Sequence, residues 1–367
     1  MKSAILGIIL SLISSNLACT ITRLDGFLAP STFCAGDLVF EDNFDFVDTS
    51  KWLFDNTLGG GGNWEFQWYP GYHNLNFQIR NGVAHFIPTL TSDYFGSEAF
   101  LSSGRITIPP DQCTQADWYG CDRTGTPDNI LNPTRSARID SRRSFGFRYG
   151  TVEFRAKMPL GDWLWPAIWF MPMHNVYGGW PRSGEIDLME MRGNYNLWSG
   201  STHVGVEQVG HTMHFGPQWD HNGWPTAHFT RNRTPGFDLD FHLYKLVWTD
   251  QHIQFYIDNQ LTGTVSAGTG FWDRGGFHNS GHANPWAGAS PMAPFDQEFY
   301  IIMNLAVGGT NYFSDYFVNL PNPKPWLNTS PRAAADFWEH RHWWLPTWNM
   351  GTEQSHMQVD YVRVWAI

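Results

Sequence analysis

The chain has 367 residues, and its 42% hydrophobic content, 36 glycines and 22 prolines indicate a globular protein with many turns. Its formal net charge of −11 excludes the broad basic surface that nucleic acids and anionic membranes require, so we expect neither as a partner. The 20 tryptophans, 13 tyrosines and 27 phenylalanines are more than a core of this size needs. Because Trp and Tyr rings have flat apolar faces and a polar edge, this composition favours a neutral sugar polymer as the partner.

Residues 1–18 are typical of a secretory signal peptide, with Lys2 near the start and an apolar run over residues 4–13 that is too short to span a membrane. No later stretch reaches the roughly 20 uninterrupted apolar residues of a membrane span. We therefore expect a secreted, extracellular monomer. Its expected parts are a short N-terminal arm over residues 19–36 and one domain over residues 37–367.

Four cysteines agree with an oxidising compartment. Cys113 and Cys121 are close enough in sequence to close one loop, and Cys19 can pair with Cys34 if signal cleavage leaves Cys19 in place. Four cysteines allow three pairings, and the sequence does not choose among them.

Short motifs bear on two further properties, N-glycosylation and metal binding. Asn232 and Asn328 begin N-glycosylation sequons, although such tripeptides are also common by chance. None of the 15 histidines belongs to a group with zinc-ligand spacing along the chain, so we expect no catalytic transition metal. The nearest approach to a cluster is His203, His211 and His214, whose spacing is irregular for ligands on one strand.

From residue 37 onward, short strand-forming segments alternate with Gly, Pro, Asn and Asp. Long helical periodicity is absent, and strands at this spacing predict a β-sandwich or a closed barrel. Residues 111–135, 268–294 and 320–348 are expected to be long surface segments. The expected strands span residues 38–40, 76–80, 83–87, 105–108, 150–157, 165–170, 244–249, 251–257, 298–305 and 357–365.

Three acids, Glu185, Asp187 and Glu190, lie within six residues of an otherwise apolar, strand-forming segment. Side chains alternate along a strand, so Glu185 and Asp187 share a face while Glu190 has the wrong parity. One extra residue, most simply Met189 as a β-bulge, would return Glu190 to that face. The sequence therefore predicts three carboxylates on one wall.

Two carboxylic acids that flank a glycosidic bond are what retaining sugar hydrolysis requires. Asp187 would hold Glu185 by hydrogen bonding, and repulsion would raise the pKa of one acid so that it stays protonated. A solvated strand edge or a carboxylate metal site also accounts for the spacing alone.

Three tryptophans lie near the acids and favour the sugar interpretation. Trp165 and Trp169 share the parity of Ala167, so both would face the same groove as the acids if the two strands are neighbours. Trp180 comes just before Glu185, where a platform for stacking a sugar would be useful.

Residues 165–169 (WPAIW) and 180–190 (WPRSGEIDLME) resemble glycoside hydrolase family 16, and the bulged form of the acid motif resembles its laminarinase (endo-β-1,3-glucanase) branch. Residues 324–330 (KPWLNTS) resemble an invertebrate subgroup that includes digestive laminarinases and catalytically inactive β-1,3-glucan recognition proteins. The likeness extends over about residues 37–367. Further matching segments are residues 212–217 (TMHFGP), 241–249 (FHLYKLVWT), 304–309 (NLAVGG) and 359–365 (VDYVRVW).

The resemblance implies an all-β jelly-roll sandwich with a concave glycan-binding cleft. It assigns Glu185 as the nucleophile, Glu190 as the general acid/base and Asp187 as an assisting group. It implies no required cofactor, and a possible structural calcium at Asp360. The sugar contacts that it suggests are Trp180, His214, Trp165, Trp169 and Asn76.

The function that these features favour is a secreted, retaining endo-β-1,3-glucanase that acts on laminarin-type polysaccharide. One alternative is a non-catalytic recognition protein of innate immunity; another is a hydrolase of the same fold with a different glucan or galactan as substrate. Recognition proteins of the subgroup usually carry an extra N-terminal sugar-binding domain and lack one or both acids. This sequence differs from the recognition proteins in both features, because only residues 19–36 precede the expected domain and both glutamates are present.

Overall fold

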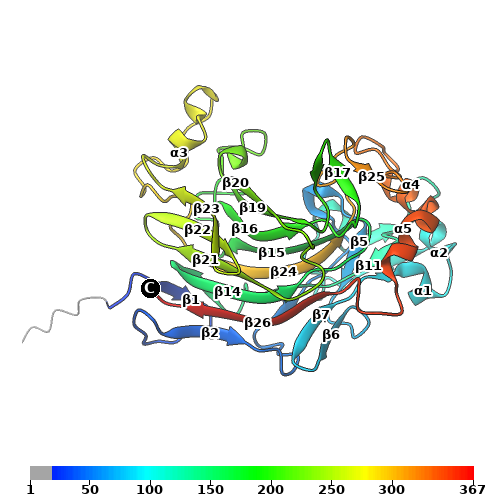
Figure 1. The fold of residues 1–367 in the computed structure, drawn as a ribbon, viewed down its shortest axis with the longest axis horizontal. Helices are drawn as coiled ribbons and strands as arrows, with labels where there is room; N and C mark the ends of the chain where they lie inside the picture. Colours follow the sequence, from blue (N-terminus) through cyan, green and yellow to red (C-terminus); the bar gives the residue numbers. More distant parts are fainter. Residues whose placement is uncertain (1–18) are drawn as a thin grey trace, which may run out of the picture.

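The computed structural model describes residues 19–367, so the predicted signal peptide lies outside the described residues. Two large, mainly antiparallel sheets lie one over the other, with α1, α2, α4 and α5 gathered at one end (Figure 1). These helices span Thr91–Phe95, Phe100–Ser103, Ala333–Glu339 and Arg341–Trp348, and α3 spans Phe271–Arg274. Short 3-10 turns are formed by Gly61–Asn63, Asp117–Tyr119, Trp224–Thr226 and Phe277–Asn279.

The first sheet carries the acid motif. Its strands, in spatial order, are β1 (Arg23–Asp25), β13 (Gly146–Arg148), β24 (Phe299–Val307), β15 (Leu164–Pro172), β16 (Glu185–Met191), β19 (Gln208–His214) and β20 (His228–Asn232). β12 (Arg138–Asp140) joins β24 and also pairs with β3 (Leu53–Phe54).

The second sheet packs against the first across the shared core. Its order is β23 (Gln260–Ser266), β22 (His252–Ile257), β21 (His242–Trp248), β14 (Gly150–Lys157), β26 (Met357–Trp365), β7 (Val83–Phe86) and β6 (Phe77–Arg80), and β2 (Leu38–Asp42) pairs with β26. Each of the ten predicted strands matches an observed strand to within a few residues.

Smaller sheets are formed by short strands within the connecting segments. Their strands are β4 (Asn56–Thr57), β5 (Gln67–Pro70), β8 (Thr89–Leu90), β9 (Arg105–Thr107), β10 (Asp122–Thr124), β11 (Thr134–Arg135), β17 (Leu197–Ser199), β18 (Thr202–His203) and β25 (Val318–Asn319).

The core lies between the two large sheets because alternate residues of each strand face it. In β14, Val152, Phe154 and Ala156 are fully buried, whereas the residues between them are half-buried. Ile186 and Met213 contribute from the first sheet. This packing turns the other face of the first sheet, and the acids on it, away from the core.

The expectation of a surface segment over residues 320–348 was wrong in part, because it contains α4 and α5. Trp344 and Trp348 are fully buried, and the Trp348 indole donates to the Asp162 carbonyl at 2.9 Å. Each helix is too short to stand alone, and Pro346 lies inside α5, so tertiary burial of aromatic rings decides this local structure. None of the helices in residues 19–367 has the length and apolar character needed to cross a bilayer.

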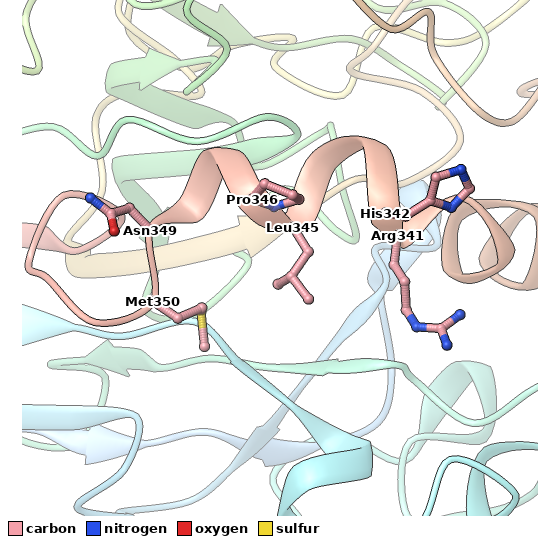
Figure 2. Close-up of a pocket in the computed structure, with 6 residues that line it drawn as sticks. All are labelled: Arg341, His342, Leu345, Pro346, Asn349 and Met350. Atoms are coloured by element: carbon pink, nitrogen blue, oxygen red, sulfur yellow. The ribbon is translucent and has the colours of Figure 1, made fainter.

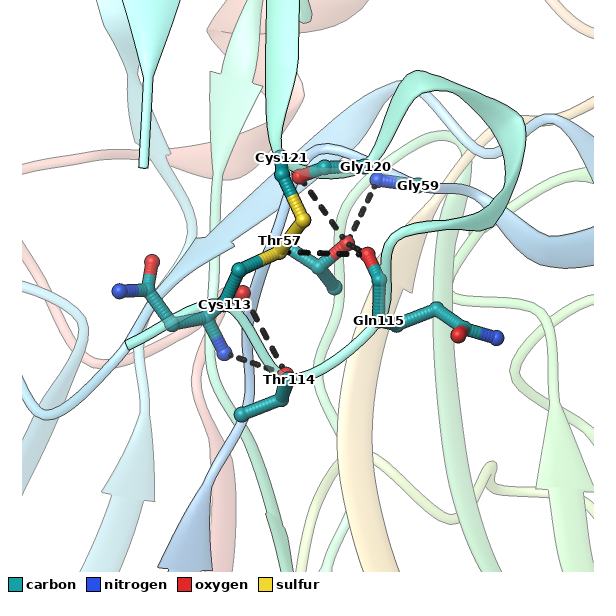
Figure 3. The surroundings of a disulfide bond; sticks show 8 residues. Thr57, Gly59, Cys113, Thr114, Gln115, Gly120 and Cys121 are labelled. Atoms are coloured by element: carbon teal, nitrogen blue, oxygen red, sulfur yellow. Dashed lines mark hydrogen bonds between the residues drawn. A yellow bond between two sulfur atoms is a disulfide. The ribbon is translucent and has the colours of Figure 1, made fainter. Parts of the chain in front are cut away.

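Of the three pairings that four cysteines allow, the structure has the one that joins neighbours in sequence. Cys113 and Cys121 are bonded, and Thr57 fastens the enclosed loop by donating to the Gln115 carbonyl at 2.8 Å (Figure 3). Cys19 is bonded to Cys34 in the N-terminal arm, which also supplies β1 to the first sheet.

The two sequon asparagines differ in their surroundings. Asn232 is exposed at the end of edge strand β20, and its amide donates to the His203 carbonyl at 2.7 Å. Asn328 is half-buried, with its amide on the Phe313 carbonyl and its oxygen accepting from Lys324. Attachment of a glycan at either position stays a prediction, and the half-buried Asn328 is the less favourable acceptor.

Candidate active site

The acid strand β16 is bulged between Asp187 and Glu190, as the parity of the motif predicts. Against β15, Trp169 lies opposite Asp187 and Ile168 lies opposite Met189. Against β15 the unmatched residue is Leu188 and not the predicted Met189, whereas against β19 both residues fall within the bulge between Asp187 and Glu190. Leu188 and Met189 are both apolar and both fully buried, and placing them together in the core turns Glu190 to the face of Glu185 and Asp187.

Glu185 is held by a tryptophan from the preceding loop. The Trp180 indole N–H donates to Glu185 Oε2 at 2.5 Å, and the Trp180 side chain is 44% exposed. Its ring lies 5.8 Å from that of His214, which is opposite Glu185 on β19. An exposed, oriented indole beside a carboxylate provides a surface on which a sugar ring can stack.

Asp187 is buried between the two glutamates. His214 Nε2 lies 3.3 Å from Asp187 Oδ2, and this contact replaces the predicted hydrogen bond between Asp187 and Glu185. Burial, followed by the charges of Glu185 and Glu190, raises the pKa of Asp187 well above its usual value.

Glu190 is held from the neighbouring strand. The Trp165 indole N–H donates to Glu190 Oε1 at 2.9 Å, and the Trp165 ring stacks on Tyr312 at 4.1 Å with an interplanar angle of 6°. Burial is the main cause of a raised pKa at Glu190, and the charge of Glu185 adds to it. A half-buried carboxyl with a raised pKa is suited to donate a proton.

His214 experiences opposing influences. Burial lowers its pKa, but the contact with Asp187 and the nearby carboxylates outweigh burial and raise the pKa to about 9. Asn222 acts in the other direction, because its amide N–H donates to His214 Nδ1 at 2.9 Å while its oxygen accepts from the Phe215 and Trp224 backbones. That contact favours a ring that carries its proton on Nε2, facing Asp187.

A cavity of about 230 Å³ opens beside Glu190. Arg192 lies along it, with its guanidinium 3.9 Å from the centre of the Tyr312 ring and 4.9 Å from that of Phe317. The other residues that line it are Ser199, Val204, Gln208, Gly210, His228 and Thr230. Because the cavity lies next to Glu190, the expected general acid, it is a suitable site for the leaving group of a substrate.

Trp169 lies on the other side of the acids, toward β24 and β12. Its indole N–H donates to Asn304 Oδ1 at 2.7 Å, and the Arg138 guanidinium covers its ring at 4.7 Å. The predicted neighbourhood of Trp169 and the acids is confirmed by its register opposite Asp187. Arg138 was not found from the sequence, because it belongs to no local pattern that marks a site, and Asn304 was noticed only as the first residue of the matching segment 304–309.

His211 was noticed only as a member of an irregular histidine group, and the structure gives it a specific contact. It is fully buried, and its Nδ1 lies 2.5 Å from the Leu188 carbonyl at the bulge. Burial lowers the pKa of His211 to about 4, so the ring is neutral and its Nδ1–H donates to Leu188. The ring also stacks on Phe255, with centroids 5.0 Å apart. His211 thus braces the bulge from behind.

Two predicted residues do not fit their predicted roles. Asn76 is 1% exposed, and its amide donates to the Ile87 carbonyl and to Thr89 Oγ1, so it has no surface to offer a sugar. Asp360 accepts a charged hydrogen bond from Arg155 at 2.7 Å, and no group of three potential metal ligands in residues 19–367 includes it. A carboxylate paired with Arg155 does not fit the calcium ligand that was expected at Asp360, and calcium binding in this region stays a prediction.

The acids themselves could also group around a metal ion, since donor atoms of Glu185, Asp187 and His214 lie within 4.8 Å of one another. However, Glu185 is already bound by the Trp180 indole. Another hollow, of about 520 Å³, lies along α5 and is lined by Arg341, His342, Leu345, Pro346, Asn349 and Met350 (Figure 2). It contains none of the predicted site residues.

The sandwich and its bulged carboxylate strand define the class of the protein. Residues 113–274 match the model for glycosyl hydrolases family 16, and the chain belongs to that family. Its fold is the predicted all-β jelly roll. It resembles the laminarinase from Rhodothermus marinus (TM-score 0.55, 23% identity, 90% of this chain and 98% of that one) and an endo-beta-1,3-glucanase from Pyrococcus furiosus (TM-score 0.54, 23% identity, 90% and 94%).

The more similar sequences carry a different kind of name. The chain is 46% identical over 339 residues to a "Beta-1,3-glucan-binding protein" from Penaeus monodon, covering 89% of this chain and 90% of that protein. It is 33% identical to "Beta-1,3-glucan-binding protein 1" from Galleria mellonella, covering 92% of this chain but only 65% of that protein. The proteins that this chain resembles therefore include some named for binding β-1,3-glucan and others named for hydrolysing it.

Proposed function

We propose that the protein is a secreted, retaining endo-β-1,3-glucanase that acts on laminarin-type polysaccharide. The observation that carries this proposal is the pairing of two glutamates on one face of a bulged strand, each held by its own indole N–H. A protein that only bound glucan would need the aromatic surface, but it would not need two oriented carboxyl groups with different environments.

The proposed chemistry is a double displacement. Glu185 attacks the anomeric carbon while Glu190, a carboxyl whose pKa is raised by burial, acts as the general acid and gives a proton to the leaving oxygen. The bond from carbon to the leaving oxygen breaks, and a covalent glycosyl-enzyme forms. Glu190, now ionised, then takes a proton from a water molecule that attacks the same carbon and releases Glu185. The anomeric configuration is retained after two inversions.

Asp187 and the tryptophans support these two roles. Asp187 lies between the two glutamates and holds His214 beside them, and burial together with the charges of the glutamates raises its pKa well above the usual value. Trp165 fixes the direction of Glu190, and Trp180 fixes Glu185 while exposing a face to the sugar. Trp169 and His214 extend the surface on either side.

The second candidate function is recognition of β-1,3-glucan without hydrolysis. The names of the relatives from Penaeus and Galleria favour it. One comparison separates the two functions: the purified protein is incubated with laminarin, and new reducing ends are counted alongside retention on insoluble β-1,3-glucan. We expect both turnover and retention. Retention without new reducing ends would reject the hydrolase and leave the recognition protein.

Trp180 should contribute to glucan binding. In a Glu185→Gln background, where substrate is not consumed, Trp180→Ala should weaken laminarin binding by about 1 to 3 kcal/mol, or roughly 5- to 150-fold in Kd. Trp180→Phe keeps a flat ring and should retain most of the affinity. Titration calorimetry measures both variants, and an unchanged Kd for Trp180→Ala would remove Trp180 from the binding surface.

His211 should act on catalysis through the bulge. Leucine at this position fills the space but cannot donate to the Leu188 carbonyl, so His211→Leu should lower kcat by about 10- to 100-fold with little change in KM. Asparagine places an N–H near the position of Nδ1, so His211→Asn should recover much of kcat. Steady-state kinetics and the Tm of both variants are the measurements. Equal losses in both would assign His211 to general core packing instead.

A further inference from the structure

A second group of ligand-type side chains lies on the second sheet, outside the proposed active site. His85 belongs to β7, where its neighbours Ala84 and Phe86 are fully buried in the core, so strand alternation turns His85 to the other face. His356 comes immediately before β26, which pairs with β7. Glu353 belongs to the same turn, because its carbonyl accepts from the His356 backbone N–H at 3.1 Å.

The two rings point at each other through the same atom. His85 Nδ1 and His356 Nδ1 form a hydrogen bond at 3.2 Å, and a Glu353 carboxylate oxygen lies within 4.8 Å of a ring nitrogen of each histidine. Two nitrogens that bind one tetrahedral zinc ion at about 2.0 to 2.1 Å are separated by about 3.4 Å. The pair therefore already has nearly the spacing that a shared metal ion imposes, although the residues are 271 positions apart in sequence.

The surroundings also suit a bound ion. His85 and His356 are only 2% and 6% exposed, so their positions are fixed by packing. Glu353 Oε1 accepts a hydrogen bond from Arg80 Nη1 at 2.7 Å, so that the other carboxylate oxygen, Oε2, is the one that can turn toward the histidines. A partner of this kind orients a ligating carboxylate, as is common around metal sites.

We propose that His85, His356 and Glu353 bind a divalent transition metal ion, zinc in the first instance, with water in the fourth position. Two imidazoles and one carboxylate match the ligand preference of zinc and not that of calcium or magnesium, which favour oxygen. The ion joins β7 to the turn before β26, and its effect is on stability. The site is independent of the proposed hydrolase chemistry.

The test is a titration of chelator-treated protein with zinc chloride. It uses the His282→Gln variant, because Asp220, His221 and His282 form an exposed group that could also take zinc. We expect one equivalent bound with micromolar or tighter Kd, and a Tm that rises by about 3 to 6 °C at a zinc concentration about 100 times Kd. Adding His356→Gln should weaken binding by at least about 100-fold and abolish the rise in Tm.

Two further measurements keep the test decisive if His356→Gln does not fold. Glu353→Gln changes a side chain in an exposed turn, and it should weaken zinc binding by about 10- to 100-fold without changing laminarin hydrolysis. Zinc-edge X-ray absorption of the loaded protein should show two imidazole ligands, whereas the acid group at Glu185 offers one. Failure to bind zinc, unchanged affinity in Glu353→Gln, or a spectrum with a single imidazole would each overturn the proposal.

Discussion

Glu185→Gln should abolish laminarin hydrolysis, with a loss of at least about 10⁴-fold in kcat, because an amide oxygen does not replace a carboxylate nucleophile. Gln still offers an oxygen to the Trp180 indole, so the local geometry and laminarin binding should be kept. Reducing-end assays and calorimetry on the same preparation measure the two properties.

The matched control is Glu339→Gln, which makes the same chemical change on an exposed residue of α4. It should leave both hydrolysis and binding unchanged. If Glu185→Gln hydrolyses laminarin within about tenfold of the parent protein, Glu185 is not the nucleophile, and the proposed double displacement fails.

Glu190→Gln should lower laminarin hydrolysis by about 10²- to 10⁴-fold, because the leaving oxygen then receives no proton from the enzyme. The same change should stabilise the fold at neutral pH. Burial raises the pKa of Glu190 above its ordinary value of 4.5, so the folded chain binds this proton more tightly than the unfolded chain does. The stability that Glu190 contributes is fully present below pH 4.5 and is lost as the pH rises through the raised pKa.

Glutamine does not titrate, so the difference in Tm between Glu190→Gln and the parent should be small near pH 4 and should grow in favour of the variant by pH 7. The Trp165 indole can still donate to the amide oxygen, which limits any loss of packing. Calorimetry at both pH values measures the difference. If the variant is less stable than the parent at pH 7, ionised Glu190 does not lower the free energy of unfolding, and this prediction is wrong.

Much of the fold follows from local sequence. The strands around residues 150–157 and 357–365 alternate clearly, and the wrong parity of Glu190 was enough to predict a bulge. The exact bulged residue did not follow, because Leu188 and Met189 are equally apolar and only the pairing with β15 distinguishes them. Helices α4 and α5 were missed because buried tryptophans stabilise them, and burial is not a local property.

The partners of the site residues were the least predictable part. Asn222 contacts His214, His211 contacts Leu188, and Tyr312 stacks on Trp165. Each of these contacts exists only after the sheets form. In the same way, a search for zinc ligands by spacing along the chain passed over His85 and His356, which the pairing of β7 with β26 brings together.

The central claim is that Glu185 and Glu190 perform a retaining hydrolysis, and proton NMR of the first products from laminarin tests it most directly. Retaining hydrolysis requires carboxyl groups about 5 to 5.5 Å apart, which leaves no room for a water molecule between nucleophile and sugar. Spectra recorded before mutarotation should show the β-anomer of the new reducing end first. Initial α-anomer would mean inversion by a directly activated water molecule, and it would contradict the assignment of Glu185 as the nucleophile.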